Sequence, residues 1–287
     1  MSIDYFKEIS YYIIPKFWKN RFNRISLEGT MIGDIYIEWW GFKKNLGDWL
    51  TLPVTQYMLS RKGLSNEIVK GGGKHRHLFV MGSIIGFKGF DATIWGTACL
   101  NLEQAYNIGR QSVFREYDIR AVRGPLTQKV LQAAGYNVPD VFGDPGILLP
   151  LFYSPSSRDK KYDISVVFHF RYARELQGFH TISIETNDYS FFIDELAASK
   201  RVISSSLHGI ILAESYGVPA ILLCENETED LFKYYDYYYS TKRYNVKIAR
   251  TIEEATIMDP MPLPQNLDEL RQGLIDTFPY DLWSKGE

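Results

Sequence analysis

Short runs of β-branched and aromatic residues alternate with stretches of helical periodicity along this chain. This alternation predicts parallel α/β units, because two parallel strands need a crossover connection that is usually a helix. In the first half we expect strands at 34–40, 77–84, 92–97 and 119–122, with helices at 48–60 and after Arg123. In the second half we expect strands at 164–168, 181–185, 201–204 and 219–224, with helices at 189–199 and 206–217.

The segment 154–161 separates these two halves. Its sequence, Ser-Pro-Ser-Ser-Arg-Asp-Lys-Lys, is polar and contains a proline, as is typical of a domain linker. We therefore expect an α/β protein with two Rossmann-like domains, 1–153 and 162–287, that face a cleft. Ligands of such sheets gather at the carboxyl ends of the strands, so functional residues are expected there.

Charge and cysteine content exclude several classes of protein. The 32 Lys and Arg residues nearly balance 34 Asp and Glu, so no nucleic-acid partner is expected. The two cysteines, Cys99 and Cys224, are too few for a disulfide framework or a cysteine metal site. We find no signal peptide and no run of about 18 apolar residues, so a cytoplasmic location is expected.

The strongest local pattern is Ser204-Ser205-Ser206-Leu207-His208-Gly209, where a predicted strand ends and a predicted helix begins. Free backbone N–H groups and the helix dipole favour an anion at such a junction. His208 would lie in the first helical turn, and Gly209 would let a ligand approach the backbone. The alternative is a capped helix whose histidine only packs.

Other polar residues also follow predicted strands or precede helices. Arg123 could bind a carboxylate or phosphate through two N–H groups, or be a surface arginine at a helix start. His169 could act as a general acid or base, or be a structural histidine. Asp48 and Asp144 could belong to the site, or only cap a helix and brace a turn.

Three further segments leave alternatives open. The tyrosine-rich run 232–239 could stack on sugar rings or pack in a core. The stretch 11–21 mixes aromatic and basic residues, which suits contact with a membrane surface or packing on the second domain. The glycine-rich segment 71–74 lacks the spacing of a phosphate-binding P-loop and is expected to be an ordinary loop.

Six segments, in this order between residues 45 and 224, resemble the polysaccharide pyruvyl transferase family. They are Asn45-Leu46-Gly47-Asp48, Met81-Gly82-Ser83-Ile84-Ile85, Ile94-Trp95-Gly96-Thr97, Ala121-Val122-Arg123-Gly124-Pro125-Leu126-Thr127, Gly143-Asp144-Pro145, and Ser205–Gly209 with Ala213–Pro219. The resemblance implies a fold similar to GT-B glycosyltransferases. It implies pyruvate transfer from phosphoenolpyruvate to a sugar of an exopolysaccharide or capsule repeat unit, with formation of a pyruvate ketal and release of phosphate.

The resemblance also implies roles for particular residues and a cellular setting. Donor contact is implied for Arg123 and His208, with the second domain as the donor side and the first as the acceptor side. The donor-binding segment would comprise Ser205, Ser206, Leu207, His208 and Gly209. The acceptor could be an oligosaccharide linked to polyprenyl diphosphate at the inner face of the cytoplasmic membrane, which a peripheral membrane contact would suit.

The remaining candidates rest on position and on the demands of the chemistry. Asn45, Asp48 and His169 are expected on the acceptor side, and the catalytic candidates are Arg123, His208, His169 and Asp48. Asp144 and Glu214 are second-tier candidates. We expect no cofactor besides the donor substrate, and no metal ion.

Two other functions fit the same residues. A GT-B glycosyltransferase of sialyltransferase type would use a nucleotide-sugar donor, and nucleotide binding would distinguish it. A non-catalytic carbohydrate-binding subunit would keep the fold without turnover, and would bind a glycan without releasing phosphate.

Overall fold

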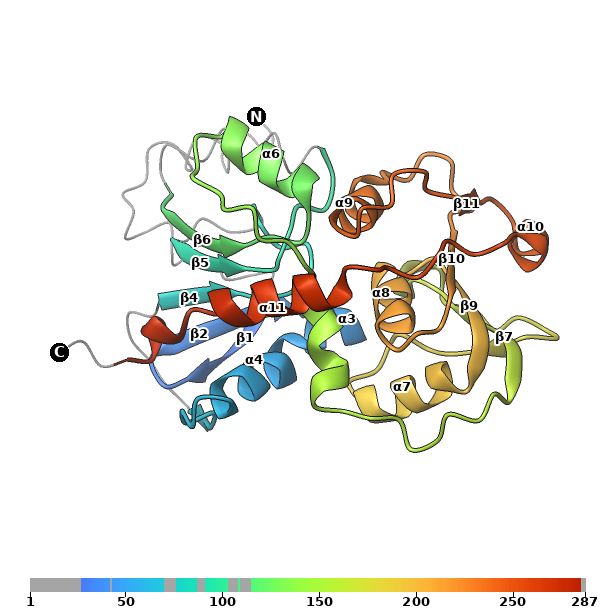
Figure 1. The fold of residues 1–287 in the computed structure, drawn as a ribbon, viewed down its shortest axis with the longest axis horizontal. Coiled ribbons are helices and arrows are strands. Elements are labelled where there is room, and N and C mark those ends of the chain that lie inside the picture. Colours follow the sequence, from blue (N-terminus) through green and yellow to red (C-terminus); the bar gives the residue numbers. More distant parts are fainter. Residues whose placement is uncertain are drawn as a thin grey trace, which may run out of the picture.

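The computed structural model describes residues 27–41, 43–69, 76–86, 91–102, 108 and 115–284, which form two β-sheets with flanking helices (Figure 1). The strands of the first sheet, in spatial order, are β3 (Ile68–Val69), β1 (Leu27–Ile32), β2 (Ile35–Trp40), β4 (Arg76–Phe79), β5 (Ala92–Trp95) and β6 (Tyr117–Ala121). Those of the second are β11 (Ile248–Ala249), β10 (Ala220–Leu223), β9 (Ser199–Ser204), β7 (Tyr162–Val167) and β8 (His180–Thr181). The predicted α/β class is confirmed.

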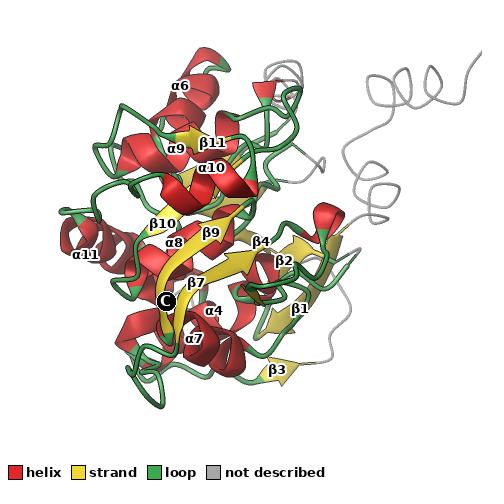
Figure 2. Cartoon of the chain, turned by 90° about the vertical axis from the view of Figure 1, so that its right-hand side faces the viewer, coloured by secondary structure: helices red, strands yellow, loops and turns green. Residues whose placement is uncertain are grey.

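Both sheets are rich in parallel pairs. Strands β2, β4, β5 and β6 run parallel, and so do all neighbouring strands of the second sheet, where β7 and β9 lie side by side (Figure 2). Strand β1 is antiparallel to β2 and β3. The sequence analysis missed β1, although Gly33-Asp34 forms a two-residue hairpin turn with a φ of 59° at Gly33.

Helices connect and cover the strands. The α-helices are α3 (Leu46–Trp49), α4 (Thr51–Ser60), α6 (Pro125–Ala133), α7 (Tyr189–Ala197), α8 (Leu207–Ser215), α9 (Phe232–Ser240), α10 (Ile252–Ile257) and α11 (Leu267–Thr277). The 3₁₀ helices are η2 (Pro145–Leu151), η3 (Phe170–Tyr172) and η4 (Tyr280–Leu282). The expected strand at 77–84 is shorter, ending at Phe79, and the chain bends three residues later at Gly82, which has a φ of 81°. The expected strand at 181–185 is also shorter, ending at Thr181.

One hydrophobic core joins the two halves. Residues of α4, η2, α7, α8 and both sheets belong to a single buried cluster. The N–H of Leu46 also donates to the carbonyl of Ile184 across the halves, at 2.9 Å. The tyrosine-rich run forms α9, in which Tyr234, Tyr237 and Tyr238 are buried in this core. The two halves are therefore held together by apolar packing, which fixes the geometry of whatever lies between them.

The C-terminal segment returns to the first sheet. Helix α11 lies along that sheet in Figure 1, and the Trp95 indole donates to the Leu274 carbonyl at 3.0 Å. The Trp283 indole donates to the Ile32 carbonyl at 2.9 Å. Residues 267–283 thus pack against the first half, although the expected second domain included them. The boundary at 154–161 itself stays a prediction.

Two expectations fall on parts of the chain outside the described residues: the aromatic and basic extension at 11–21, and the loop at 71–74. Among the residues that are described, no helix combines the length and the apolar character that crossing a membrane requires.

Candidate functional site

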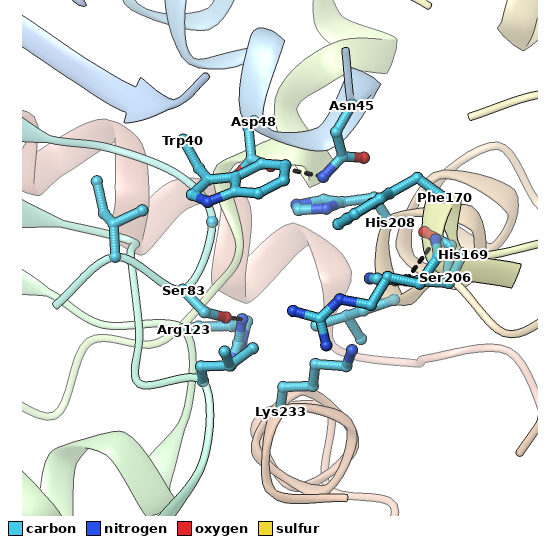
Figure 3. A pocket seen from close by; sticks show the side chains of 15 residues that line it. Trp40, Asn45, Asp48, Ser83, Arg123, His169, Phe170, Ser206, His208 and Lys233 are labelled. Carbon is cyan, nitrogen blue, oxygen red and sulfur yellow. Dashed lines mark hydrogen bonds between the residues drawn. The ribbon is translucent and has the colours of Figure 1, made fainter. Parts of the chain in front are cut away.

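A pocket lies between the two halves, where several strands end at their carboxyl edges (Figure 3). Its volume, including the open mouth, is about 710 Å³. The first half contributes Trp40, Asn45, Asp48, Gly82, Ser83, Ile84, Leu100 and Arg123, and the second half contributes His169, Phe170, Arg171, Ser206, Leu207, His208 and Lys233. Trp40 is the last residue of β2, whereas Arg123 follows β6, His169 follows β7 and Ser206 follows β9, as the strand-end rule predicts.

Helix α8 begins at the floor of this pocket. Its N-cap residue is Ser206, whose side chain makes no capping hydrogen bond to the helix. His208 lies in the first turn, and its Nε2 is 3.5 Å from Oδ2 of the buried Asp144. Burial acts to raise the pKa of Asp144, but the charges of His208 and Arg123 and the hydrogen bond from the Gly146 N–H together lower that pKa. Asp144 therefore places a carboxylate beside the imidazole, while its other oxygen accepts from the Gly146 N–H at 3.0 Å.

The motif Asn45–Asp48 packs directly on His208. A Cβ atom added to Gly47 would lie 1.8 Å from His208 Nδ1, so only glycine allows α3 to approach the ring this closely. Asn45 Nδ2 donates to Asp48 Oδ2 at 2.5 Å. Burial raises the pKa of Asp48 to about 6, even though His208 and Asn45 act in the opposite direction. Burial thus makes this carboxyl group easier to protonate than an ordinary aspartate.

Arg123 is fully buried, with no solvent-exposed surface. Its guanidinium donates to Ser83 Oγ and to the Cys99 carbonyl, both at 3.0 Å, and Nε lies 3.4 Å from the buried Asp236. The sequence analysis expected an arginine that grips a ligand with two N–H groups. The structure instead shows a guanidinium held in place by protein groups, with the Ser83 hydroxyl beside it at the pocket wall.

Lys233 and Arg171 add positive charge that the sequence analysis did not assign. Lys233 lies on α9, is buried, and contacts Glu229 at 3.3 Å. Burial lowers the pKa of Lys233 against the opposing effect of Glu229, and the positive charges of Arg123 and Arg171 lower it further. Arg123, Arg171 and Lys233 line the same pocket, as expected of an anion-binding site.

His169 stands at the end of β7 as an uncharged imidazole. Its Nδ1 accepts from the backbone N–H of Arg171 at 3.3 Å, and the backbone N–H of His169 donates to Ser205 Oγ at 2.9 Å. Burial lowers the pKa of His169 to about 3, and Lys233, Arg171 and His208 reinforce that direction. Because Nδ1 is an acceptor, the proton sits on Nε2, and His169 can donate one hydrogen bond without carrying charge.

Four of the predicted site residues lie away from the pocket lining: Asp144, which lies behind His208, and Ser205, Gly209 and Glu214. Ser205 positions His169, as described above. Gly209 lets helix α8 pack closely on the end of β9, because a Cβ added to this glycine would lie 2.3 Å from Ser204 Oγ. Glu214 is buried in a bidentate ion pair with Arg243, both contacts being 2.6 Å, and accepts from the Tyr237 hydroxyl at 2.6 Å.

No group of three or more His, Cys, Asp or Glu side chains in the described part of the chain is arranged to hold a metal ion. The metal-free expectation stays a prediction.

Fold and site together define an α/β protein with a cationic pocket between two parallel-rich sheets. Residues 108–228 match the family model described as polysaccharide pyruvyl transferase, so the predicted resemblance to that family is confirmed over this span. The span includes Arg123, Asp144, His169, Ser206 and His208.

One curated relative is an uncharacterized protein of Acanthamoeba polyphaga mimivirus, which is 31% identical over 175 residues. The match covers 56% of this chain and 58% of the relative, so the chain spans little more than half of that protein's length. No solved structure matches the chain.

Proposed function

We propose that the protein transfers pyruvate from phosphoenolpyruvate to two hydroxyls of one sugar, forming a cyclic ketal and releasing phosphate. The observation that carries this proposal is the gathering of Arg123, Arg171, Lys233 and His208 around the N-terminus of α8. A small donor with both a carboxylate and a phosphate needs this density of cations. The family match over residues 108–228 supports pyruvyl transfer.

In this proposal the phosphate binds the N–H groups at the start of α8, beside His208 and Lys233. Its negative charge then interacts with the positive end of the helix dipole. The carboxylate binds near Ser83, whose hydroxyl is held by Arg123. The Asp144 carboxylate keeps His208 oriented toward the phosphate, where an imidazolium would stabilise the charge that builds up as phosphate leaves.

The reaction requires three proton movements and four bond changes at the two donor carbons. The methylene carbon of the donor gains a proton, and the neighbouring carbon bonds to the first sugar oxygen, which loses its own proton. The bond from that carbon to the phosphate oxygen then breaks, and phosphate departs with the electron pair. The second sugar hydroxyl bonds to the same carbon and gives its proton to phosphate or water, which closes the ketal ring.

Asp48 is the residue we assign to the first proton exchange. With a pKa of about 6, its carboxyl can supply a proton to the methylene carbon and recover one from the attacking hydroxyl. Asn45 holds the Asp48 carboxylate, and His169 donates a neutral hydrogen bond to an acceptor hydroxyl. Neither role needs a cofactor or a metal ion, in keeping with the expectation from sequence.

The acceptor in this proposal is a sugar of an exopolysaccharide or capsule repeat unit, including units carried on polyprenyl diphosphate at the inner face of the cytoplasmic membrane. The two halves would then act as the acceptor and donor sides of an arrangement similar to GT-B glycosyltransferases. A cytoplasmic enzyme with a peripheral membrane contact suits such an acceptor.

Calorimetric titration with phosphoenolpyruvate, CMP and UDP tests the donor. We expect saturable binding of phosphoenolpyruvate and no binding of either nucleotide. Nucleotide binding without phosphoenolpyruvate binding would favour the glycosyltransferase function instead. Glycan binding that is unaffected by His208→Ala and releases no phosphate would favour the non-catalytic subunit.

A further inference from the structure

A second hollow adjoins the cationic pocket, and it shares Trp40 and Asn45 with that pocket. Its volume, including its opening, is about 610 Å³. Its lining differs in character, with Trp39 and Trp49 among several polar side chains in place of buried cations. The two hollows are therefore two neighbouring compartments of one cleft.

We infer that this second hollow is a glycan subsite, which binds the sugar next to the one that receives pyruvate. The inference rests on the proposed function, since it extends the acceptor side of that site. It predicts that the acceptor is an oligosaccharide of at least two sugars rather than a free monosaccharide. Indole rings suit this role because they stack on the apolar faces of sugar rings.

The indole rings of the subsite are held in fixed orientations. Trp49 meets Trp39 edge to face, with ring centroids 5.5 Å apart and an angle of 79° between planes. Trp49 remains partly exposed, whereas Trp39 is buried beneath it. Trp40 stacks on Phe170 of the second half at 5.1 Å, with an angle of 30°. Rigid aromatic surfaces of this kind can bind a sugar ring with little loss of side-chain entropy.

Polar groups around the rings come from both halves of the molecule. Glu28, Lys43 and Lys44 are exposed on the first half, and Thr186 and Asn187 lie opposite them on the second. Carboxylate, amide and hydroxyl groups around an aromatic floor can bind sugar hydroxyls on several sides. Asn45 links the two compartments, because it lines both and also donates to Asp48. A sugar beside Asn45 would thus present its hydroxyls to Asp48 while its neighbour occupies the hollow.

The test measures retention of the protein on a panel of immobilised oligosaccharides, each paired with its terminal monosaccharide, in saturating phosphoenolpyruvate. We expect retention on at least one oligosaccharide that is stronger than on the matching monosaccharide. Trp49→Ala should weaken that retention about tenfold, which corresponds to the loss of one stacking contact. Trp49→Phe should restore part of it, and Tyr244→Ala, an exposed aromatic outside the hollow, should change nothing.

Equal retention on oligosaccharide and monosaccharide, an unchanged affinity in Trp49→Ala, or retention on no glycan would overturn the subsite. Calorimetric titration of the same proteins with phosphoenolpyruvate separates this failure from failure of the proposed function. If wild type and Trp49→Ala bind phosphoenolpyruvate equally, the donor assignment stands whatever the glycan result. If wild type does not bind phosphoenolpyruvate but shows Trp49-dependent glycan retention, the subsite stands and the donor is wrong.

Discussion

The two walls of the cationic pocket present their positive charge differently. On the wall from the first sheet, Arg123 has no exposed surface and is fixed by Ser83, Cys99 and Asp236. On the opposite wall, Arg171 is exposed and Lys233 forms an ion pair with Glu229 at 3.3 Å. The comparison indicates that the first wall is a rigid anchor built on Arg123 and three protein groups, whereas the second wall presents Arg171 to solvent.

Asp236 explains why the first wall is so rigid. This residue belongs to α9, yet its carboxylate accepts from the N–H groups of Leu126 and Thr127 at the start of α6, each at 3.0 Å. It also accepts from the Thr127 hydroxyl at 2.7 Å. Arg123 therefore compensates a buried carboxylate that joins two helices, and its removal is expected to destabilise the fold.

The largest effect is expected for Arg123→Met. Removal of the guanidinium leaves Asp236 buried and uncompensated, which should lower the free energy of unfolding by about 3–5 kcal/mol. Phosphoenolpyruvate binding should be lost as well. Urea denaturation measures the loss of stability, and calorimetry measures the loss of phosphoenolpyruvate binding. If Arg123→Met fails to fold, Arg123→Lys replaces it, because one ammonium cannot satisfy all three partners of the guanidinium. An unchanged urea midpoint together with normal phosphoenolpyruvate affinity would contradict the role of Arg123 as an anchor.

Glu214→Gln should reduce stability without changing the pocket. Breaking the buried pair with Arg243 should cost about 3–5 kcal/mol, whereas phosphoenolpyruvate affinity should stay within about twofold of wild type at a temperature where the variant is folded. This variant separates loss of stability from loss of binding. Weakened binding with unchanged stability would instead place Glu214 in the site.

Asp48→Asn should stabilise the protein in a pH-dependent manner. Folding raises the pKa of Asp48 from 3.8 to about 6, so the charged form is disfavoured in the folded state, and wild type loses stability as the pH rises through this range. The gain from Asn should be near zero below pH 4 and reach at most about 3 kcal/mol above pH 7. Thermal denaturation at several pH values measures it. A difference that does not change with pH would rule out the raised pKa.

Lys233→Met should weaken phosphoenolpyruvate binding by about 10- to 100-fold, the usual value of one charged hydrogen bond. The melting temperature should stay the same or rise, because burial already disfavours the Lys233 charge. Lys242→Met removes the same charge from an exposed position and should leave affinity unchanged. Equal loss of affinity in both variants would mean that overall charge, rather than the pocket, controls binding.

Much of the site could be predicted from sequence because it lies at strand ends. The start of α8 with His208, Arg123 after β6 and Asp48 in the first long helical segment all follow local patterns. Arg171 and Lys233 could not be found this way, because their importance depends on how α9 and the loop after β7 pack across the cleft. Nothing local marks Lys233 within the tyrosine-rich run as different from a surface lysine.

The class of the fold could also be predicted from sequence, but some of its long-range packing could not. Alternating strands and helices identify an α/β protein, but the return of α11 to the first sheet depends on contacts such as Trp95 with Leu274, which are 179 positions apart. Glu214 shows the same limit at a single residue. Its partner Arg243 is 29 positions away, so a buried structural pair could not be distinguished from a site carboxylate.

A crystal structure of the protein with phosphoenolpyruvate tests the central claim most directly. The account predicts a phosphate at the start of α8, in contact with His208 and Lys233, and a carboxylate near Ser83 beside Arg123. Phosphoenolpyruvate bound elsewhere, or with its phosphate away from α8, would contradict it.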